Sequence, residues 1–196
     1  MPAATSTREA IKRWEATNPD TPIAEAKWAN LVCQLPPMDK MGEELNQFES
    51  CEKMSLSTNA IERMTALPKL KNIRILSLSR NNIKRIMALD EVGQSLQELW
   101  LSYNQIDKID GLQNCVKLKV FFLGNNRVRS WDELNKVAML PEIKNVLFIG
   151  NPIWHSLGKD DKDQFIPQVV KRIPQLDTVD GKQVLQEHRD AAEAMD

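Results

Sequence analysis

Five asparagines recur along the chain at nearly even spacing, and each lies in the same frame of apolar residues. They are separated by 22, 23, 22 and 25 residues. Apolar side chains precede each one by eight, five and three positions and follow it by two. One such unit has too few apolar residues to enclose a core, so the units must stack on one another. The five residues are Asn59, Asn81, Asn104, Asn126 and Asn151.

This frame is the leucine-rich repeat. Its L-x-L segment alternates, which is typical of a strand with one buried face, and stacked strands lie about 4.8 Å apart. The segment after each Asn has helical spacing, as in Ile83-x-x-Ile86-x-x-Leu89. We therefore predict an α/β solenoid, with a parallel β-sheet on one wall and helical or irregular returns on the other. The asparagine amides are interpreted as structural, because they can satisfy backbone groups where the chain leaves each strand.

A single leucine-rich-repeat domain is expected over residues 1–196. It is divided into an N-terminal helical cap (1–36), the repeats (37–157), and a C-terminal cap with a terminal helix (158–196). The terminal helix is expected over residues 182–194. Caps are needed because an end repeat would otherwise expose its core.

Two helices are predicted in the N-terminal cap. The capping box Ser6-x-x-Glu9 predicts the start of the first. Thr21-Pro22, a cap residue followed by proline, predicts the start of the second. The apolar residues expected to face the core are Ala10, Ile11 and Trp14 in the first helix, and Ile23, Ala26 and Leu31 in the second.

Composition excludes several classes of function. The net charge of −1 argues against a general polyanion binder, so no nucleic acid is expected. The sequence has no apolar run typical of a signal peptide or membrane span, and we expect a soluble, intracellular protein without membrane contact. We also expect it to be a monomer within a larger complex. Cys33, Cys51 and Cys115 lack metal spacing and are interpreted as reduced core cysteines.

Residue patterns typical of catalysis are also missing from the sequence. Neither His155 nor His188 has a nucleophile or carboxylate set around it. There is no phosphate-binding glycine loop and no paired Cys/His spacing. We predict a binding module that is not an enzyme and has no catalytic residues, metal or cofactor.

The binding surface is predicted on the strand residues that point away from the core. The middle outward column changes from serine (Ser55, Ser77) to large apolar residues (Trp100, Phe122, Leu147) along the solenoid. Exposed apolar area of this size is typical of an interaction site. Coverage of the aromatics by the chain itself, for example by the C-terminal helix or a loop, is the alternative. The predicted partner-binding residues are Ile75, Arg80, Trp100, Tyr103, Val120, Phe122, Leu147 and Ile149.

Basic residues cluster in the second repeat (Arg80, Lys84, Arg85) and in the fourth (Arg127, Arg129). We interpret most of them as solvated surface charge, with a rim that attracts an acidic partner as the alternative. A second contact is predicted on the terminal helix, through Lys182, His188 and Arg189.

Over nearly its full length, the chain resembles the leucine-rich-repeat light chains of outer-arm axonemal dynein. The Glu98–Asn104 run, Glu-Leu-Trp-Leu-Ser-Tyr-Asn, is the most specific part of the resemblance. The other matching segments are Ile11–Trp14, Cys51–Asn59, Arg74–Ile83 and Gly150–Pro152.

The resemblance implies a non-catalytic subunit of cilia or flagella, placed in the cytoplasm and the axonemal cytoskeleton, that binds a dynein heavy chain. It also implies an association with the microtubule-binding stalk tip, with tubulin or the motor head as other contacts. The repeat frame and the cap alone would also fit a phosphatase regulatory subunit or a spliceosomal A′ protein. The alternative function is therefore a regulatory scaffold for a phosphatase or a ribonucleoprotein.

Overall fold

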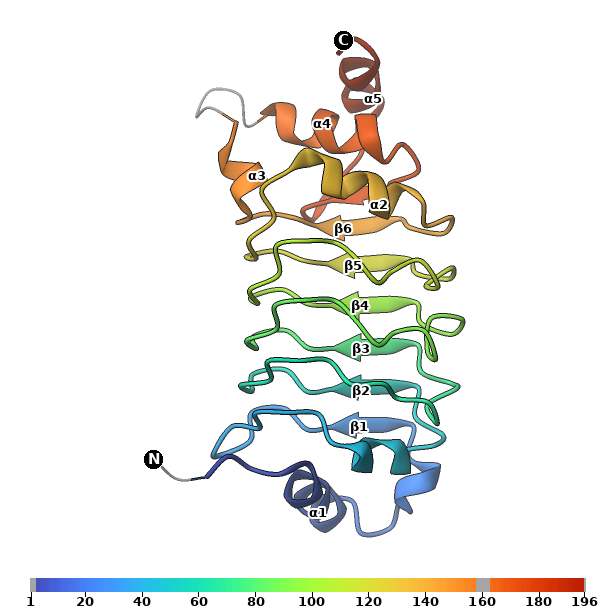
Figure 1. Cartoon of the computed structure of the whole chain (residues 1–196). Coiled ribbons are helices and arrows are strands. Elements are labelled where there is room, and N and C mark those ends of the chain that lie inside the picture. Colours follow the sequence, from blue (N-terminus) through green and yellow to red (C-terminus); the bar gives the residue numbers. More distant parts are fainter. Residues whose placement is uncertain (1–2, 158–162, 196) are drawn as a thin grey trace.

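The strands stack along one wall of an elongated solenoid, as the computed structural model shows (Figure 1). It describes residues 3–157 and 163–195. Seven strands pair in parallel in chain order, and the last strand pairs antiparallel. The predicted fold class is confirmed. The strands are β1 (Trp28–Asn30), β2 (Lys53–Ser55), β3 (Ile75–Ser77), β4 (Glu98–Trp100), β5 (Val120–Phe122), β6 (Asn145–Leu147), β7 (Thr178–Val179) and β8 (Lys182–Gln183).

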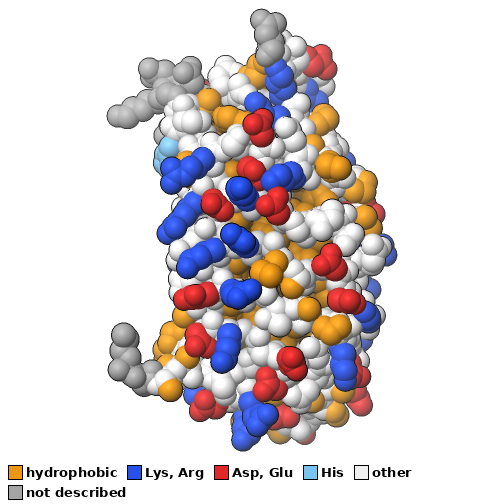
Figure 2. Space-filling view, in the orientation of Figure 1, with side chains coloured by type: hydrophobic (Ala, Val, Ile, Leu, Met, Phe, Trp, Pro, Cys, Tyr) orange, Lys and Arg blue, Asp and Glu red, His pale blue; other side chains and the backbone are white. Residues whose placement is uncertain are grey.

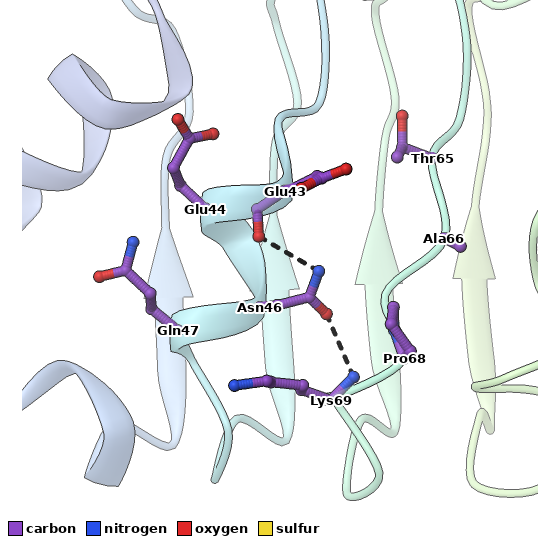
Figure 3. A pocket seen from close by; sticks show the side chains of 8 residues that line it. All are labelled: Glu43, Glu44, Asn46, Gln47, Thr65, Ala66, Pro68 and Lys69. Carbon is purple, nitrogen blue, oxygen red and sulfur yellow. Dashed lines mark hydrogen bonds between the residues drawn. The ribbon is translucent and has the colours of Figure 1, made fainter.

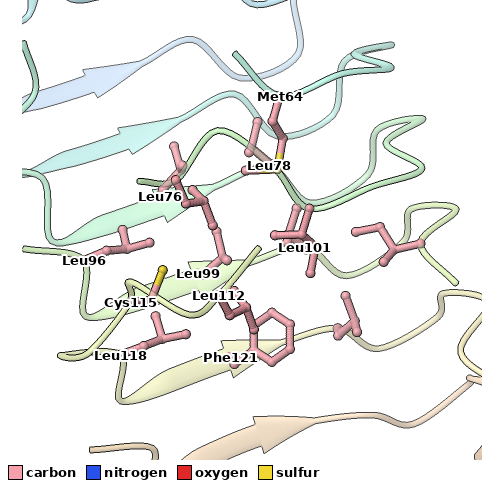
Figure 4. Packing of buried hydrophobic residues seen from close by; sticks show 14 of the residues in the cluster. Met64, Leu76, Leu78, Leu96, Leu99, Leu101, Leu112, Cys115, Leu118 and Phe121 are labelled. Carbon is pink, nitrogen blue, oxygen red and sulfur yellow. The ribbon is translucent and has the colours of Figure 1, made fainter. Parts of the chain in front are cut away.

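The core lies between the sheet and the returns. The central residue of each strand points inward and pairs in register with the central residue of the next, so one apolar row runs through the solenoid. Leucines from the returns close the other side of this row (Figure 4). The row consists of Ala29, Met54, Leu76, Leu99, Phe121 and Val146, each at most 1% exposed.

The returns are helical only toward the ends of the solenoid. The return after β1 contains the 3₁₀ helix η2 (Glu43–Gln47), and the return after β5 contains η3 (Trp131–Glu133) and α2 (Leu134–Ala138). Residues Ile83, Ile86 and Leu89 have helical spacing and are buried, but their return is irregular. The apolar contacts form there without a helix.

The asparagines join neighbouring repeats through their amides. Asn104 accepts from Ile83 N (2.9 Å) of the preceding repeat and donates to Leu78 O and Leu101 O (both 3.0 Å). Asn59, Asn81, Asn126 and Asn151 repeat this pattern, and we call the five residues the asparagine ladder. Each amide thus fixes the end of its own strand and the first return residues of the repeat before it.

The first N-terminal helix forms as predicted. α1 (Thr7–Thr17) begins at Ser6, whose hydroxyl accepts from Glu9 N (3.2 Å), and it buries Ala10, Ile11 and Trp14. At 11 residues and with a polar face, α1 is too short and too polar to cross a membrane, and the same holds for every other helix in the described residues.

The second predicted N-terminal helix is wrong. Pro22 leads only into the single 3₁₀ turn η1 (Ile23–Glu25), and the chain then forms β1, which pairs with β2. Ala29 in β1 and Leu31 directly after it are both buried, and pairing with β2 satisfies backbone groups that an isolated short helix would leave to solvent. Residues 1–36 therefore contain the strand of a further repeat in addition to a helical cap.

The terminal helix starts later than predicted. Asp180 and Gly181 both have positive φ (51° and 76°), which is the geometry of a two-residue hairpin turn, and residues 182–183 become β8. Helix α5 covers only Gln186–Glu193 and packs against α4 (Phe165–Arg172). The predicted boundary between repeats and C-terminal cap adjoins residues 158–162, which lie outside the described residues.

The cysteines are all free thiols. Cys51 and Cys115 are buried as predicted, and burial raises the pKa of the Cys115 thiol to about 11. Cys33 is exposed, so its assignment to the core is wrong. It follows β1 in a left-handed conformation (φ 51°), where the chain turns out of the sheet.

Candidate partner-binding site

The sheet face carries outward side chains in two main columns. The register aligns Ser77, Trp100, Phe122 and Leu147 in one column on β3 to β6. The second column, on the same strands, contains Ile75, Glu98, Val120 and Asn145. The predicted apolar residues of the two columns are only half-buried, namely Ile75, Trp100, Val120, Phe122 and Leu147.

Trp100 and Phe122 form the centre of the face. Their rings stack with centroids 5.9 Å apart and planes inclined by 27°. The Trp100 indole Nε1 donates to Glu98 Oε2 (3.1 Å). This hydrogen bond satisfies the polar atom of the indole and holds the ring in place, so the face offers a preset apolar surface.

Arg80 and Tyr103 extend the face beyond the strand ends. The guanidinium carbon of Arg80 lies 4.5 Å from the centre of the Tyr103 ring. Both residues have positive φ (56° and 59°), and their N–H groups donate to Ser102 O and Gly124 O. Tyr103 is 49% exposed. The two predicted residues therefore act as one cation–π unit, in which the Arg charge is held over an exposed ring.

Gly124 provides room on the C-terminal side of the face. A Cβ at this position would lie 3.1 Å from Leu147 Cδ2 and 3.2 Å from Ile149 O. Ile149 is 40% exposed. The absence of a side chain lets Leu147 pack next to the aromatic pair, which continues the apolar surface onto β6.

The serine half of the face bonds to itself. Ser57 and Ser77 hydroxyls lie 2.7 Å apart, and Ser55 donates to Ser57 (3.4 Å). Ser102 is buried, and its Oγ has no hydrogen-bond partner among the described residues. Groups that are already paired within the chain offer little to a partner, so the apolar half is the stronger candidate for binding.

An apolar group at the N-terminal end of the face was not predicted from the sequence. Trp28 on β1 is 53% exposed, and Lys53 Nζ lies 5.2 Å from the centre of its ring. Val32, which follows β1, is also exposed. The available signal was Gln34, which lies 25 residues before Asn59 and takes the place of the ladder asparagine.

The terminal helix does not cover the aromatic residues of the sheet face. Helix α5 packs on α4 at the end of the solenoid (Figure 1). Arg189 donates to Pro174 O (2.7 Å) and Leu176 O (2.9 Å), and His188 Nδ1 accepts from Leu185 N (3.0 Å). Lys182 on β8 is exposed. Of the three residues of the predicted second contact, Lys182 is exposed, whereas His188 and Arg189 also hold the cap together.

A hollow of about 640 Å³ lies on the return side, between η2 and the next return (Figure 3). Asn46 bridges its walls, accepting from Lys69 N (3.1 Å) and donating to Glu43 O (3.2 Å). Across residues 3–157 and 163–195, no three His, Cys, Asp or Glu side chains converge in a way that could hold a metal ion.

Comparison with known proteins identifies close relatives. The family model for leucine-rich repeats in two copies matches residues 94–136. Dynein axonemal light chain 1 of Mus musculus is 42% identical, covering 95% of this chain and 97% of the relative. The Homo sapiens protein of the same name is 43% identical, covering 94% and 96%. The crystal structure of internalin C2 from Listeria monocytogenes shares the fold, with a TM-score of 0.56, 23% identity and coverage of 71% and 55%.

Proposed function

The chain belongs to the dynein axonemal light chain 1 family, and we propose on that premise that it is a non-catalytic subunit that attaches to an outer-arm dynein heavy chain through its sheet face. Its place is the axoneme of cilia or flagella. The relatives favour this function over a scaffold for a phosphatase or ribonucleoprotein, and no feature of the sheet face favours that second function.

The observation that carries the proposal is the stacked pair Trp100–Phe122, half-buried at the centre of the face. Aromatic and arginine side chains are enriched where truncation costs at least about 2 kcal/mol of binding free energy. The Tyr103–Arg80 unit lies beyond the strand ends, and Leu147 on β6 is the register partner of Phe122. A heavy-chain segment with apolar side chains fits such a surface.

The deciding experiment compares two double variants in co-purification with the heavy chain. Trp100→Ser with Phe122→Ser should abolish binding. Val116→Ser with Met139→Ser removes exposed apolar side chains outside the sheet strands and should leave binding unchanged. Circular dichroism verifies that both variants fold. Unchanged binding by the first pair would show that the sheet face is not the attachment site.

The second part of the proposal is that binding changes the affinity of the motor for microtubules. A subunit can do this only by binding one state of the motor more tightly than another. We assign the second contact to Lys182, His188 and Arg189, which present basic groups at the end of the solenoid. Because contacts between exposed charges are screened, the effect should weaken as salt rises.

Co-sedimentation of the heavy-chain stalk tip with microtubules, with and without the subunit, tests this second part. Lys182→Gln should reduce the effect. It is a cleaner variant than any change at Arg189, whose guanidinium also bonds to two backbone carbonyls. Equal microtubule affinity with and without the subunit at low salt would leave attachment without modulation.

A further inference from the structure

A cationic strip follows the ends of the strands, outside the sheet face. We call it the strand-end strip and define it as residues 60–63, 82–85, 105–108 and 127–130, the four positions after each of four ladder asparagines. It contains only two acidic residues, Glu62 and Asp107, although the chain as a whole has a net charge of −1. Its cations, all exposed, are Arg63, Lys84, Arg85, Lys108, Arg127 and Arg129.

The cations of the strip follow one another from repeat to repeat along one side of the solenoid. Figure 2 shows Lys and Arg side chains gathered along the side toward which the strand arrows of Figure 1 point, with fewer Asp and Glu among them. Arg63, Arg85 and Lys108 occupy the same position, four residues after the asparagine, in three consecutive repeats. Neighbouring strands lie about 4.8 Å apart, so these cations form a column along the solenoid axis.

These cations have no acidic partner within the described part of the chain, since none of the six takes part in an ion pair there. At the other ends of the strands the opposite holds. Lys27, Arg74, Lys119 and Lys144, each immediately before a strand, are all paired with carboxylates. The strip thus holds six unpaired cations against two carboxylates, and an acidic ligand would relieve the repulsion among the cations.

The backbone beneath the strip is fixed in advance. The residue two positions after each asparagine is buried, and its N–H donates to the asparagine of the next repeat at 2.9–3.1 Å. Arg127 N also donates to Ile106 O (2.8 Å), which ties the fourth repeat to the third. Because the backbone spacing is fixed, the ordering cost on the side of this protein is limited to the side-chain rotamers.

We propose that the strand-end strip binds an extended acidic polypeptide segment that runs along the long axis of the solenoid. Nucleic acid fits less well, because the strip contains no aromatic residue on which bases could stack and the chain has a pI of about 6.2. A peptide rich in Asp or Glu needs only carboxylates at short intervals, and the long Arg and Lys side chains absorb differences in spacing.

This inference goes beyond the proposed function. The strip shares no residue with the sheet face or with the second contact near the C-terminus. Failure of the test below would leave heavy-chain attachment unaffected, and failure of the Trp100 and Phe122 experiment would leave the strip unaffected.

The test measures binding of a short fluorescent poly-glutamate peptide to the full chain by anisotropy at low salt. The strip variant is Arg63→Gln, Arg85→Gln and Lys108→Gln combined. The matched control is Lys71→Gln, Lys119→Gln and Lys144→Gln combined, which changes the net charge equally but replaces ion-paired cations. We expect the strip variant to lose at least about tenfold in affinity. The control should change by less than about twofold, because rim charges outside a contact contribute little.

Equal losses in the two variants would overturn the proposal, because they would show attraction by net charge alone. Absence of binding by the parent chain at low salt would also overturn it. A single-stranded RNA of matched charge serves as competitor, and tighter binding of the RNA than of the peptide would reject the assignment of the ligand class. Circular dichroism and urea denaturation should show the parent fold in both variants, since all six replaced side chains are on the surface.

Discussion

The two ends of the repeat strands join neighbouring repeats through different kinds of contact. At the strand starts, cations pair with carboxylates of neighbouring repeats, and Glu52 pairs with both Lys27 (3.3 Å) and Arg74 (3.8 Å). At the strand ends, the asparagine ladder joins the repeats through buried amides, and the exposed charges above it are mostly positive and unpaired within the described residues. Buried neutral amides join the repeats at the strand ends, and exposed ion pairs connect them at the strand starts.

The comparison shows which edge can change its charge without loss of structure. Exposed ion pairs contribute little free energy, typically 0–1 kcal/mol, whereas an unsatisfied buried polar group costs about 1–3 kcal/mol. Cohesion at the strand ends therefore depends on the ladder and not on surface charge. The surface charges there are free to serve recognition.

Loss of a ladder amide should give the largest effect. Asn104→Ala leaves Ile83 N without its acceptor and removes two donors to buried carbonyls, so the free energy of unfolding should fall by about 1–3 kcal/mol. Urea denaturation measures the change. Asn82→Ala is the control, because its amide makes only one long bond, 3.5 Å to Ala60 O, and it should change stability far less. Equal stability of Asn104→Ala and the parent would refute the structural role of the ladder.

Asp180 closes the last repeat at the strand ends, and its effect should depend on pH. Its Oδ1 accepts from Phe148 N (2.6 Å) and Ile149 N (3.0 Å), and Oδ2 has no partner within residues 3–157 and 163–195. Burial raises the pKa of the carboxyl above its usual 3.8. The folded state therefore holds this proton more tightly than the unfolded chain. The stabilisation that the protonated Asp180 contributes to the fold is complete below pH 3.8 and is lost as pH rises through the raised pKa.

Asp180→Asn keeps an acceptor oxygen but carries no charge at any pH. The stability of this variant relative to the parent should rise with pH above 3.8, as measured by urea denaturation across that range. Asp39→Asn, at an exposed aspartate, controls for the loss of one negative charge. A stability difference that stays constant with pH would argue against the raised pKa.

The strand-start edge should respond more weakly. Glu52→Gln removes both ion pairs of that carboxylate, which are exposed to solvent, and should lower the free energy of unfolding by about 0.2–1 kcal/mol. High salt should abolish the difference between variant and parent, because screening removes the attraction in both. A loss that persists in high salt would indicate a packing role for Glu52.

The smallest effect is expected at the strand-end strip. Arg85→Gln removes an exposed, unpaired cation, so the free energy of unfolding should stay within about 0.5 kcal/mol of the parent or rise slightly. Urea denaturation at low salt is the measurement. A clear loss of stability would mean that the cations contribute to folding and that the two edges are more alike than their contacts suggest.

The sequence predicted the parts of the fold in which side-chain identity repeats at fixed offsets. The apolar frame around Asn81 and Asn104 was sufficient to predict the parallel sheet and its outward columns. It failed at β1, where Ala29 and Gln34 stand in place of the usual leucine and asparagine, and the proline at position 22 favoured a helix. It failed again at β8, because two strand residues after a turn are too short a pattern to recognise.

Features of the candidate site that depend on register could not be read from the sequence. The outward placement of Trp100 and Phe122 follows from alternation, but their stacking and the bond from Trp100 to Glu98 require the paired strands. The contrast between paired and unpaired charges has the same origin. Lys119 and Glu142 are 23 positions apart, and only the stacking of one repeat on the next brings them within 3.5 Å.

The asparagine ladder also determines where this molecule can change in length. Each amide bonds to both its own repeat and the one before, so the segment around every strand end has a fixed number of residues. Extra residues are accommodated elsewhere. The repeat of 25 residues between Asn126 and Asn151 forms η3 and α2 in its return, whereas those of 22 and 23 residues return without a helix. Insertions and deletions should therefore be tolerated on the return wall. The sheet wall keeps a constant spacing between repeats, which any bound partner must match.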